Sequence, residues 1–468
     1  MNIRQIPYIL GPALFGLSTY LPSHAFSEPE KLMVGVLAWM LVWWITEIVN
    51  LAVTALLPIL LLPATGVLPL KEVTQSYGHP LIYLFFGGFV LALAIEKWNL
   101  HRRIALWIIR SIGASPKRIL LGFMLATAFL SAWISNTATT VMMLPMVLSV
   151  IQLLQKAGFE DHKTNIALLV GTAWAANIGG MSTLIGTPPN LVFTGFYQAE
   201  LGVEISFAEW LKVGLPIAAT LFAMAYFILT LILGKGSKTN QSIKAYFNRE
   251  WDKLGPLDGP ERKVAIVFAS TAALWIFRPN ILEFIPIPEF TDTSVAILSA
   301  LVLFVIPAHS DKPLLVWKDT RKLAWGILVL FGGGMALAQG MNASGLLSHV
   351  TDLFSDQSES SMLFWILSMA VLGVWATEVM SNMALVAAMM PIVAAISVAT
   401  NVDFMLLALP LTLGASCAFM LPMATPPNAI VFGSGMLKII DMVKSGIWMN
   451  MAATLVITAI VYVMSLFL

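Results

Sequence analysis

Two polar motifs, each present twice, stand inside otherwise apolar stretches of the sequence. The first is Ser-Asn-Thr at residues 135–137, which returns as Ser-Asn-Met at 381–383. The second is Thr-Pro-Pro-Asn, at residues 187–190 and again at 425–428. Their side chains offer hydroxyl and amide groups but no acid–base pair. The chemistry that they favour is therefore the binding of ions by neutral oxygen and nitrogen atoms.

The motifs recur in the same order at nearly one offset. Ser135 and Ser381 are 246 residues apart, and the two Thr-Pro-Pro-Asn motifs are 238 residues apart. A third match, Phe-Gly-Gly starting at Phe86 and at Phe331, has an offset of 245 residues. Three ordered matches indicate two homologous halves. In secondary transporters such halves commonly pack as inverted repeats around the binding site. A duplication kept only for architecture is the alternative.

The repeat predicts four segments along the chain. We expect a first helix region at 1–29, a first repeat at 30–235, a linker at 236–263 and a second repeat at 264–468. Residues 234–263 hold seven Lys and Arg side chains. The positive-inside rule therefore places this polar stretch in the cytoplasm. The loop at 350–360 has no Lys or Arg, and we expect it on the outer side.

The elements that position the Ser-Asn motifs are expected to be two hairpins of helices. The stretch 119–154 is apolar on both sides of Ser135-Asn136, which leaves arms of about 16 residues, or about 24 Å as helix. Neither arm spans a hydrocarbon core of about 30 Å comfortably. Ser and Asn also favour helix caps over helix interiors. We predict re-entrant hairpins with tips at 135–137 and at 381–383, the second within 361–400.

The Thr-Pro-Pro-Asn motifs predict unwound backbone. Two consecutive prolines remove two N–H donors and do not fit inside a regular helix. Non-helical backbone at membrane depth persists only where it is buried in protein or lines a cavity. We expect residues 186–190 and 424–428 to be unwound. Their free carbonyl oxygens suit a hard cation such as Na⁺, and the helix N-termini beside them suit an anion.

Charge is almost absent from the stretches that build this site. Residues 119–155, 164–211 and 323–437 contain no Lys or Arg. An anion bound there would rest on hydroxyls, amides and helix dipoles alone, and its desolvation would be costly. A metal cation bound beside it would remove that cost and would couple the two ions. A neutral substrate is the alternative.

Composition sets the class of protein. Of the 468 residues 58% are apolar and 11% are charged, against about 25% charged in soluble proteins. This excludes a soluble enzyme, a nucleic-acid binder and a disordered scaffold. We expect an all-α polytopic membrane protein with about eleven full crossings plus partial ones. A retained first helix is favoured over a cleaved signal peptide at residues 1–20.

The pattern Trp-x-Thr-Glu occurs twice in apolar stretches of the sequence. Its final residue is Glu47 in the first occurrence and Glu378 in the second. Ionisable groups at such depth are functional candidates, although interface-level or internally hydrogen-bonded acids are the structural alternative. Because carboxylates repel anions, we do not expect either acid to contact the substrate. The six His residues are scattered and Cys417 is the single cysteine. An intramembrane enzyme is therefore a remote alternative.

The tips, the two Thr-Pro-Pro-Asn loops and the run from Ala424 to Gly435 together resemble the divalent anion–sodium symporter family, over essentially the whole chain. INDY-like members carry dicarboxylates and citrate, and others carry sulfate. The resemblance implies eleven transmembrane helices, two re-entrant hairpins and a homodimer. Each protomer would have a scaffold domain and a transport domain that moves as an elevator. The location it implies is a bacterial inner membrane.

The resemblance also assigns residues to sites. It implies a first sodium site of Ser131, Ser135, Asn136 and the Gly186 carbonyl. It implies a second sodium site of Thr377, the Met380 carbonyl, Asn382 and the Ala424 carbonyl. It implies a substrate site of Ser135, Asn136, Thr137, Ser381, Asn382, Met383, Thr425 and Pro426.

The expected function is sodium-coupled symport of divalent anions, above all C4-dicarboxylates such as succinate, with two or more Na⁺. A sodium-independent exchanger and a sulfate or tricarboxylate transporter of the same fold are the alternatives. The chain departs from the family pattern at two positions. Met383 stands where the typical second tip has Thr, which leaves the size and identity of the anion open. Asn50 stands where the family usually has proline.

Overall fold

The computed structural model describes residues 5–156, 162–233, 241–284, 287–288, 290–309, 312–354 and 361–466, without the side chain of Glu200. The first half consists of helices α1 Ile6–Ser18, α2 Glu28–Thr46, α3 Leu51–Thr54, α4 Leu57–Ala64, α5 Leu70–Ser76, α6 Pro80–Lys97, α7 Leu100–Ile112, α8 Pro116–Ser131, α9 Asn136–Lys156, α10 His162–Met181, α11 Pro188–Leu201 and α12 Phe207–Leu233.

The second half consists of α13 Gln241–Leu254, α14 Gly259–Phe284, α15 Asp292–Val305, β1 Pro307–His309, β2 Lys312–Pro313, the 3₁₀ helix η2 Trp317–Lys322, α16 Trp325–Ser344, α17 Leu346–Phe354, α18 Met362–Ala376, α19 Asn382–Thr400, α20 Phe404–Ala415, α21 Pro426–Phe432 and α22 Ile439–Met464. The two short strands pair antiparallel and are the only strands in the described part of the chain. The all-α fold expected from the sequence is confirmed.

Apolar helices of membrane-spanning length account for much of the chain. Within the described residues, seven helices are long and apolar enough to cross a bilayer. Five further apolar stretches are 10–17 residues long, among them α15, α18 and α20. The short ones include helices that end at the breaks described below. The expected count of eleven crossings remains an expectation.

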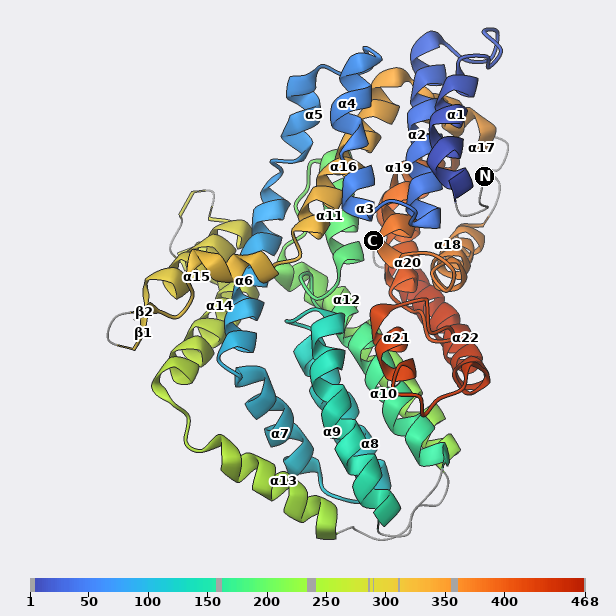
Figure 1. The fold of residues 1–468 in the computed structure, drawn as a ribbon. Helices are drawn as coiled ribbons and strands as arrows, with labels where there is room; N and C mark the ends of the chain where they lie inside the picture. Colours follow the sequence, from blue (N-terminus) through green and yellow to red (C-terminus); the bar gives the residue numbers. More distant parts are fainter. Residues whose placement is uncertain are drawn as a thin grey trace.

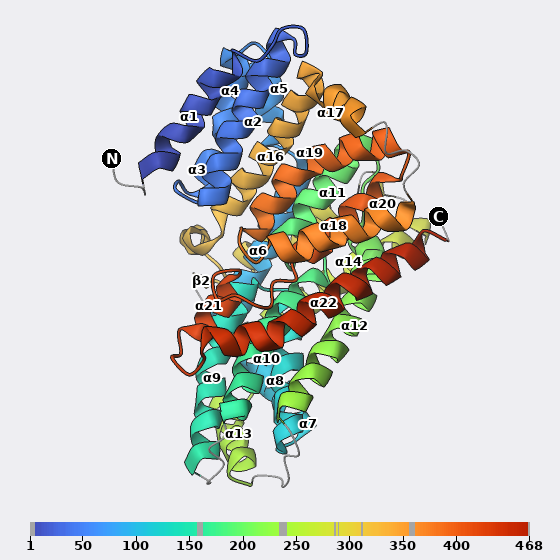
Figure 2. The same cartoon turned by 90° about the vertical axis from the view of Figure 1, so that its right-hand side faces the viewer.

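The helices form an elongated body (Figure 1). Helices α1–α5, α16 and α17 gather at one end, and α7, α13 and the outer ends of α8–α10 lie at the other (Figures 1 and 2). Helices α8–α12 and α18–α22 pack on one another, through α12 on α22, α10 on α21 and α11 on α19. Helices α8–α12 and α18–α22 therefore form one continuous body between the two ends of the molecule.

Both predicted hairpin tips lie at a junction between two helices, with the Ser of each tip in the break and the next two residues in the following helix. Helix α8 ends at Ser131 and α9 begins at Asn136, whereas α18 ends at Ala376 and α19 begins at Asn382. Helices α8 and α9 lie side by side in both views (Figures 1 and 2). Gly180 on α10 packs against the first tip so closely that a Cβ there would clash with Asn136 Oδ1. The tip is thus seated on α10.

The unwound segments differ from the prediction in their position. The helices break over residues 182–187 and 416–425, and Gly186, Thr187, Ala424 and Thr425 belong to the breaks. The residues from Pro188 and from Pro426 onward were predicted to be unwound, and this is wrong because they begin α11 and α21. A proline suits the first helical turn, where its missing N–H would have no partner anyway.

The predicted linker 236–263 contains α13 and the first residues of α14. Residues 236–240 lie outside the described part. Ile243 and Phe247 of α13 are buried, so the helix packs by an apolar face and α7 is its neighbour. Outside the membrane-spanning helices, the hydrogen bond from Lys253 lowers the pKa of Glu250. Of the predicted outer loop 350–360, residues 350–354 end α17 and the remainder is outside the described residues.

One guanidinium joins α7 to α13 and α14. Arg103 on α7 donates to Glu261 in the first turn of α14, from Nε at 2.6 Å and from Nη2 at 2.9 Å. Its Nη1 donates to the Gly255 carbonyl at 3.0 Å, just beyond the end of α13. The same guanidinium lies 5.6 Å from the centre of the Trp251 ring. A single side chain of the first half therefore holds the start of the second.

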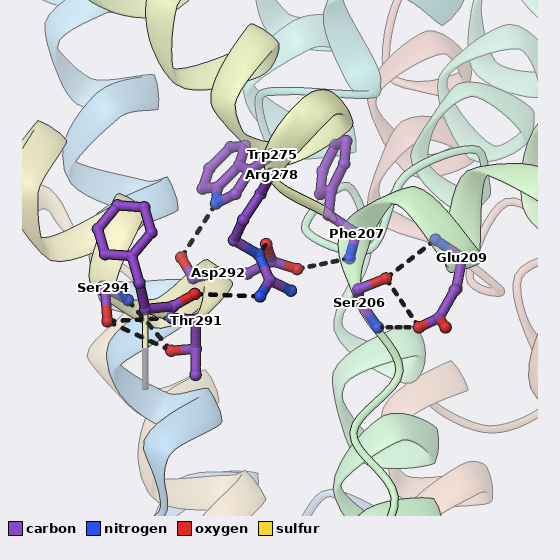
Figure 3. A network of polar contacts seen from close by, with 9 residues as sticks. Ser206, Phe207, Glu209, Trp275, Arg278, Thr291, Asp292 and Ser294 are labelled. Atoms are coloured by element: carbon purple, nitrogen blue, oxygen red, sulfur yellow. Dashed lines mark hydrogen bonds and ion pairs between the residues drawn. The ribbon is translucent and has the colours of Figure 1, made fainter. Parts of the chain in front are cut away.

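A second junction between the halves is a buried carboxylate (Figure 3). Asp292 at the start of α15 accepts hydrogen bonds from Arg278 Nε at 2.7 Å and from the Phe207 N–H at 2.6 Å. The Asp292 carbonyl accepts from Trp275 Nε1 at 3.0 Å. Phe207 begins α12, so this junction holds the start of α12 against the C-terminal part of α14 and the start of α15.

Candidate functional site

The four helix breaks meet at one cavity of about 810 Å³. This is within the usual range for small-molecule sites, about 300–1,000 Å³. The lining includes all eight residues proposed to meet the substrate, namely Ser135, Asn136, Thr137, Ser381, Asn382, Met383, Thr425 and Pro426. Gly186, Met380 and Ala424 line it as well, whereas Ser131 and Thr377 are buried behind it. The fold thus brings together residues that are up to 291 positions apart.

At the first tip three oxygen atoms converge. The Ser131 hydroxyl oxygen lies 2.7 Å from Asn136 Oδ1 and 2.8 Å from the Ala176 carbonyl oxygen. A hydroxyl has one proton to donate, so it cannot serve both acceptors at once. A cation bound here would coordinate the oxygen lone pairs that do not accept this proton.

The second tip repeats the arrangement. The Thr377 hydroxyl oxygen lies 2.6 Å from Asn382 Oδ1 and 2.8 Å from the Ala415 carbonyl oxygen. Thr377 is 246 residues after Ser131, and Asn382 is 246 residues after Asn136, so the two clusters are equivalent positions of the repeat. The matched geometry supports the proposed division into two related halves.

Sequence reasoning missed three members of these clusters. The carbonyls of Ala176 and Ala415 carry no side-chain signal, because any residue could supply them. Asn177 lines the cavity, is 1% exposed, and its Oδ1 has no hydrogen-bond partner among the described residues. An Asn in an apolar helix just before a break was the available signal. Because a buried acceptor without a partner is costly, this oxygen is available as a further ligand for a cation in the cavity.

The donor set fits a hard, weakly charged cation. All the oxygens of the two clusters are neutral hydroxyl, amide or carbonyl atoms, which is the type of ligand that unwound transporter helices offer to Na⁺. No group of three or more His, Cys, Asp or Glu residues within the described part of the chain could hold a metal ion. The site therefore fits sodium and does not fit a transition metal.

The anion side of the cavity is built from helix starts. Helices α9, α11 and α19 begin at Asn136, Pro188 and Asn382, all of which line the cavity. Helix N-termini carry partial positive charge and unpaired N–H groups. None of the described residues that line the cavity is a Lys, Arg or His. An anion would therefore be held by backbone, hydroxyl and amide groups and by cations bound beside it.

The Asn of each Thr-Pro-Pro-Asn motif has a structural role. Asn190 Nδ2 donates to the Thr183 carbonyl at 2.8 Å, and Asn428 Nδ2 donates to the Leu421 carbonyl at 3.0 Å. Both asparagines are completely buried and neither lines the cavity. Each one ties the first turn of its helix back to the unwound segment before it.

The two acids of the Trp-x-Thr-Glu pattern have different surroundings. Glu378 is 4% exposed, and its carboxylate accepts from the backbone N–H groups of Phe419, Met420 and Leu421 at 2.8–2.9 Å. Asn450 Nδ2 donates to it at 2.8 Å. Glu378 therefore clamps the unwound segment that carries Ala424. Glu47, in contrast, is exposed and lines the same cavity as the two tips, although neither acid was expected to contact the substrate.

The two departures from the family pattern can be placed. Met383 is 6% exposed and lines the cavity where the first tip presents Thr137. The second tip thus offers a thioether and no hydroxyl at this position. Asn50 directly precedes α3, and its Oδ1 accepts from the Ala52 N–H at 2.9 Å. It is a helix cap, a role that proline cannot fill with its side chain.

Comparison with known proteins gives one consistent result. Residues 7–468 match the family described as "Sodium:sulfate symporter transmembrane region". The sodium-dependent dicarboxylate transporter SdcS of Staphylococcus saprophyticus is 39% identical over 475 residues, which is 98% of this chain and 91% of that protein. SdcS of Staphylococcus aureus is 39% identical over 472 residues, with the same coverage. The crystal structure of the YdaH transporter of Alcanivorax borkumensis is similar in fold, with a TM-score of 0.54, 14% identity, and coverage of 94% of this chain and 98% of that one.

Proposed function

The chain belongs to the family of the sodium:sulfate symporter transmembrane region, and from this premise we propose that it is a sodium-coupled symporter of C4-dicarboxylates such as succinate. The resemblance stated from the motifs is thereby confirmed, and the chain is a multi-pass membrane transporter rather than an enzyme. The SdcS relatives support dicarboxylate as the substrate class. We infer a bacterial inner membrane from their bacterial sources.

One observation carries the proposal. The cavity joins two equivalent clusters of neutral oxygens to three helix N-termini, and none of its described lining residues has a cationic side chain. A dianion in such a site requires bound cations to balance its charge. Two clusters provide places for at least two Na⁺. Binding of anion and binding of sodium then become interdependent.

The test is uptake by proteoliposomes that contain the purified full chain. Radiolabelled succinate should accumulate with an inward sodium gradient and should not accumulate with an equal potassium gradient. Succinate–succinate counterflow in the absence of sodium distinguishes the exchanger alternative. Uptake that is equal in sodium and in potassium would overturn symport.

We further propose that the site moves as an elevator. All four breaks belong to α8–α12 and α18–α22, which pack as one body, whereas Ile45, Leu51 and Ile327 of the cavity wall come from α2, α3 and α16. Movement of the first body past this wall would open the site to each side in turn. The implied homodimer would be formed by the stationary part.

Paired cysteines test the movement. Cys417 is completely buried, so Thr46→Cys with Val379→Cys would place the two accessible thiols on opposite sides of the proposed sliding interface. Cross-linking them with a short bifunctional thiol reagent should stop transport, and reduction should restore it. Each single-cysteine variant is the matched control. Full transport by the cross-linked protein would contradict the elevator.

A further inference from the structure

The cavity has one charged residue in its lining, and that residue is an acid. Among the described residues that line it, Glu47 alone has an ionisable side chain. Glu47 directly follows α2 and has a left-handed backbone conformation, with φ at 47°. Its side chain is exposed. A site that suits an anion therefore has a fixed negative charge in its wall.

The carboxylate of Glu47 is available to act on the contents of the cavity. Seven ion pairs are present in the described part of the chain, and the acid in each of them is a residue other than Glu47. Glu378 differs, because three backbone N–H groups and Asn450 surround its carboxylate. No cationic partner in the described part of the chain therefore neutralises the charge of Glu47, and this charge acts on ions that enter the cavity.

Glu47 also comes from a different part of the fold than the two tips. The tips belong to the hairpins α8–α9 and α18–α19, and Glu47 belongs to the wall formed by α2, α3 and α16. It therefore lines the cavity without belonging to either oxygen cluster. Its effect on an ion depends on the charge of that ion and hardly on its shape.

We propose that Glu47 sets the charge selectivity of the cavity: it favours sodium ahead of the anion and disfavours a trianion more than a dianion. This inference rests on the proposed function and adds a specificity-determining residue to it. The repulsion between Glu47 and an anion grows in proportion to the anion's charge. Sodium bound first offsets that repulsion, so Glu47 favours an order in which cations arrive before the anion.

Proportionality to charge gives a sharp expectation for Glu47→Gln. If removal of one negative charge raises affinity about threefold per unit of anion charge, succinate gains about tenfold and citrate about thirtyfold. The ratio of citrate to succinate affinity should then rise about threefold at saturating sodium. The sodium concentration for half-saturation should rise as well, since the cation loses an attractive charge.

The experiment is equilibrium binding to the purified full chain at saturating sodium and at pH 8, where both anions are fully ionised. Glu47→Asp keeps the charge and should keep the wild-type ratio. Glu72→Gln is the matched control, because Glu72 is exposed on α5 and does not line the cavity. If Glu47→Gln does not fold, Glu47→Asn removes the same charge with a residue that tolerates the left-handed conformation.

Ionic strength separates charge from shape. Added choline chloride should shrink the difference between wild type and Glu47→Gln, because salt screens interactions of exposed charges. A difference that is independent of salt would overturn the proposal.

Two negative outcomes are distinguishable. If wild type shows no sodium-dependent binding of succinate, the proposed function fails and the inference fails with it. If wild type binds succinate with sodium, and Glu47→Gln has the same citrate-to-succinate ratio as Glu72→Gln, the proposed function stands and Glu47 is not the charge filter.

Discussion

Thr377 and Asn382 bring two oxygen atoms within 2.6 Å of each other across the break between α18 and α19. The Ala415 carbonyl oxygen is 2.8 Å from the same Thr377 hydroxyl. Ser131 and Asn136 repeat this relationship in the first half at 2.7 Å. One hydroxyl proton cannot serve both acceptors at once, so each cluster has oxygen lone pairs left for a cation. The following predictions start from that interpretation.

Removal of either hydroxyl should weaken sodium dependence. Thr377→Ala and Ser131→Ala each delete one cation ligand, so the half-saturating sodium concentration should rise about tenfold or more, as for loss of one interaction with a charged group. Succinate affinity at saturating sodium should change less. Ser368→Ala on α18 is the control, since among the described residues its hydroxyl donates only to the Phe364 carbonyl of its own helix. An unchanged sodium titration would remove both residues from the sodium sites.

The tip asparagines should be indispensable. We expect Asn136→Ala and Asn382→Ala each to abolish transport while the protein remains folded, because each Asn is proposed to serve a cation and the substrate together. Uptake in proteoliposomes and the elution profile of the purified variants provide the two measurements. Wild-type rate and sodium dependence in either variant would show that the site is assigned wrongly.

Met383→Thr should change the preference among anions. The variant adds a hydroxyl at a lining position equivalent to Thr137. A hydrogen bond to a charged group contributes roughly 1.5–3 kcal/mol, or about ten- to a hundredfold in affinity. Competition of succinate, citrate and sulfate against labelled succinate measures the effect. The same competition profile in variant and wild type would mean that residue 383 does not face the substrate.

Glu378 should stabilise the unwound segment before α21. Glu378→Ala removes the acceptor of three backbone N–H groups, those of the buried Phe419 and of the half-buried Met420 and Leu421. A buried donor left without an acceptor costs about 1–3 kcal/mol, and a half-buried one costs less because water can reach it. The melting temperature, followed by tryptophan fluorescence in detergent, should fall clearly. Asn450→Ala removes one donor and should have a smaller effect. Glu72→Gln again serves as the control. A Glu378→Ala variant with the melting temperature of the wild type would show that Glu378 does not stabilise this segment.

Coupling should be reciprocal. Sodium should raise the affinity for the anion, and the anion should raise the affinity for sodium by the same factor, because linkage between two ligands is symmetric. Potassium should not replace sodium in these small oxygen clusters. Calorimetric titration with succinate at zero and at saturating sodium measures the factor. Equal affinity in the two titrations would leave the exchanger alternative in place of symport.

The sequence predicted the parts of the fold that depend on local chemistry. Ser135-Asn136 and Ser381-Asn382 interrupt apolar stretches, and a helix break there follows from residue type alone. The breaks before Pro188 and Pro426 were predicted at nearly the right place, but the prolines themselves start helices because a first turn needs no N–H.

Other features depend on packing between distant segments. The carbonyls of Ala176 and Ala415 become ligands only through their neighbours, so no residue type marks them. Helix α13 was missed because its polar composition hid the few apolar residues, Ile243 and Phe247, that dock it. Glu47 and Glu378 share a sequence pattern, yet only the tertiary structure shows that one lines the cavity and the other is enclosed by backbone.

The contacts of Arg103 have a consequence for the way the chain can be assembled. Arg103 belongs to the first half, and its partners Gly255 and Glu261 belong to the second, so this attachment does not depend on an unbroken peptide chain. A gene interrupted between the codons for α12 and α13 would encode two polypeptides that each carry one tip of the cavity. We expect such fragments to associate through α7, α13 and α14 when co-expressed, and to transport only as a complemented pair.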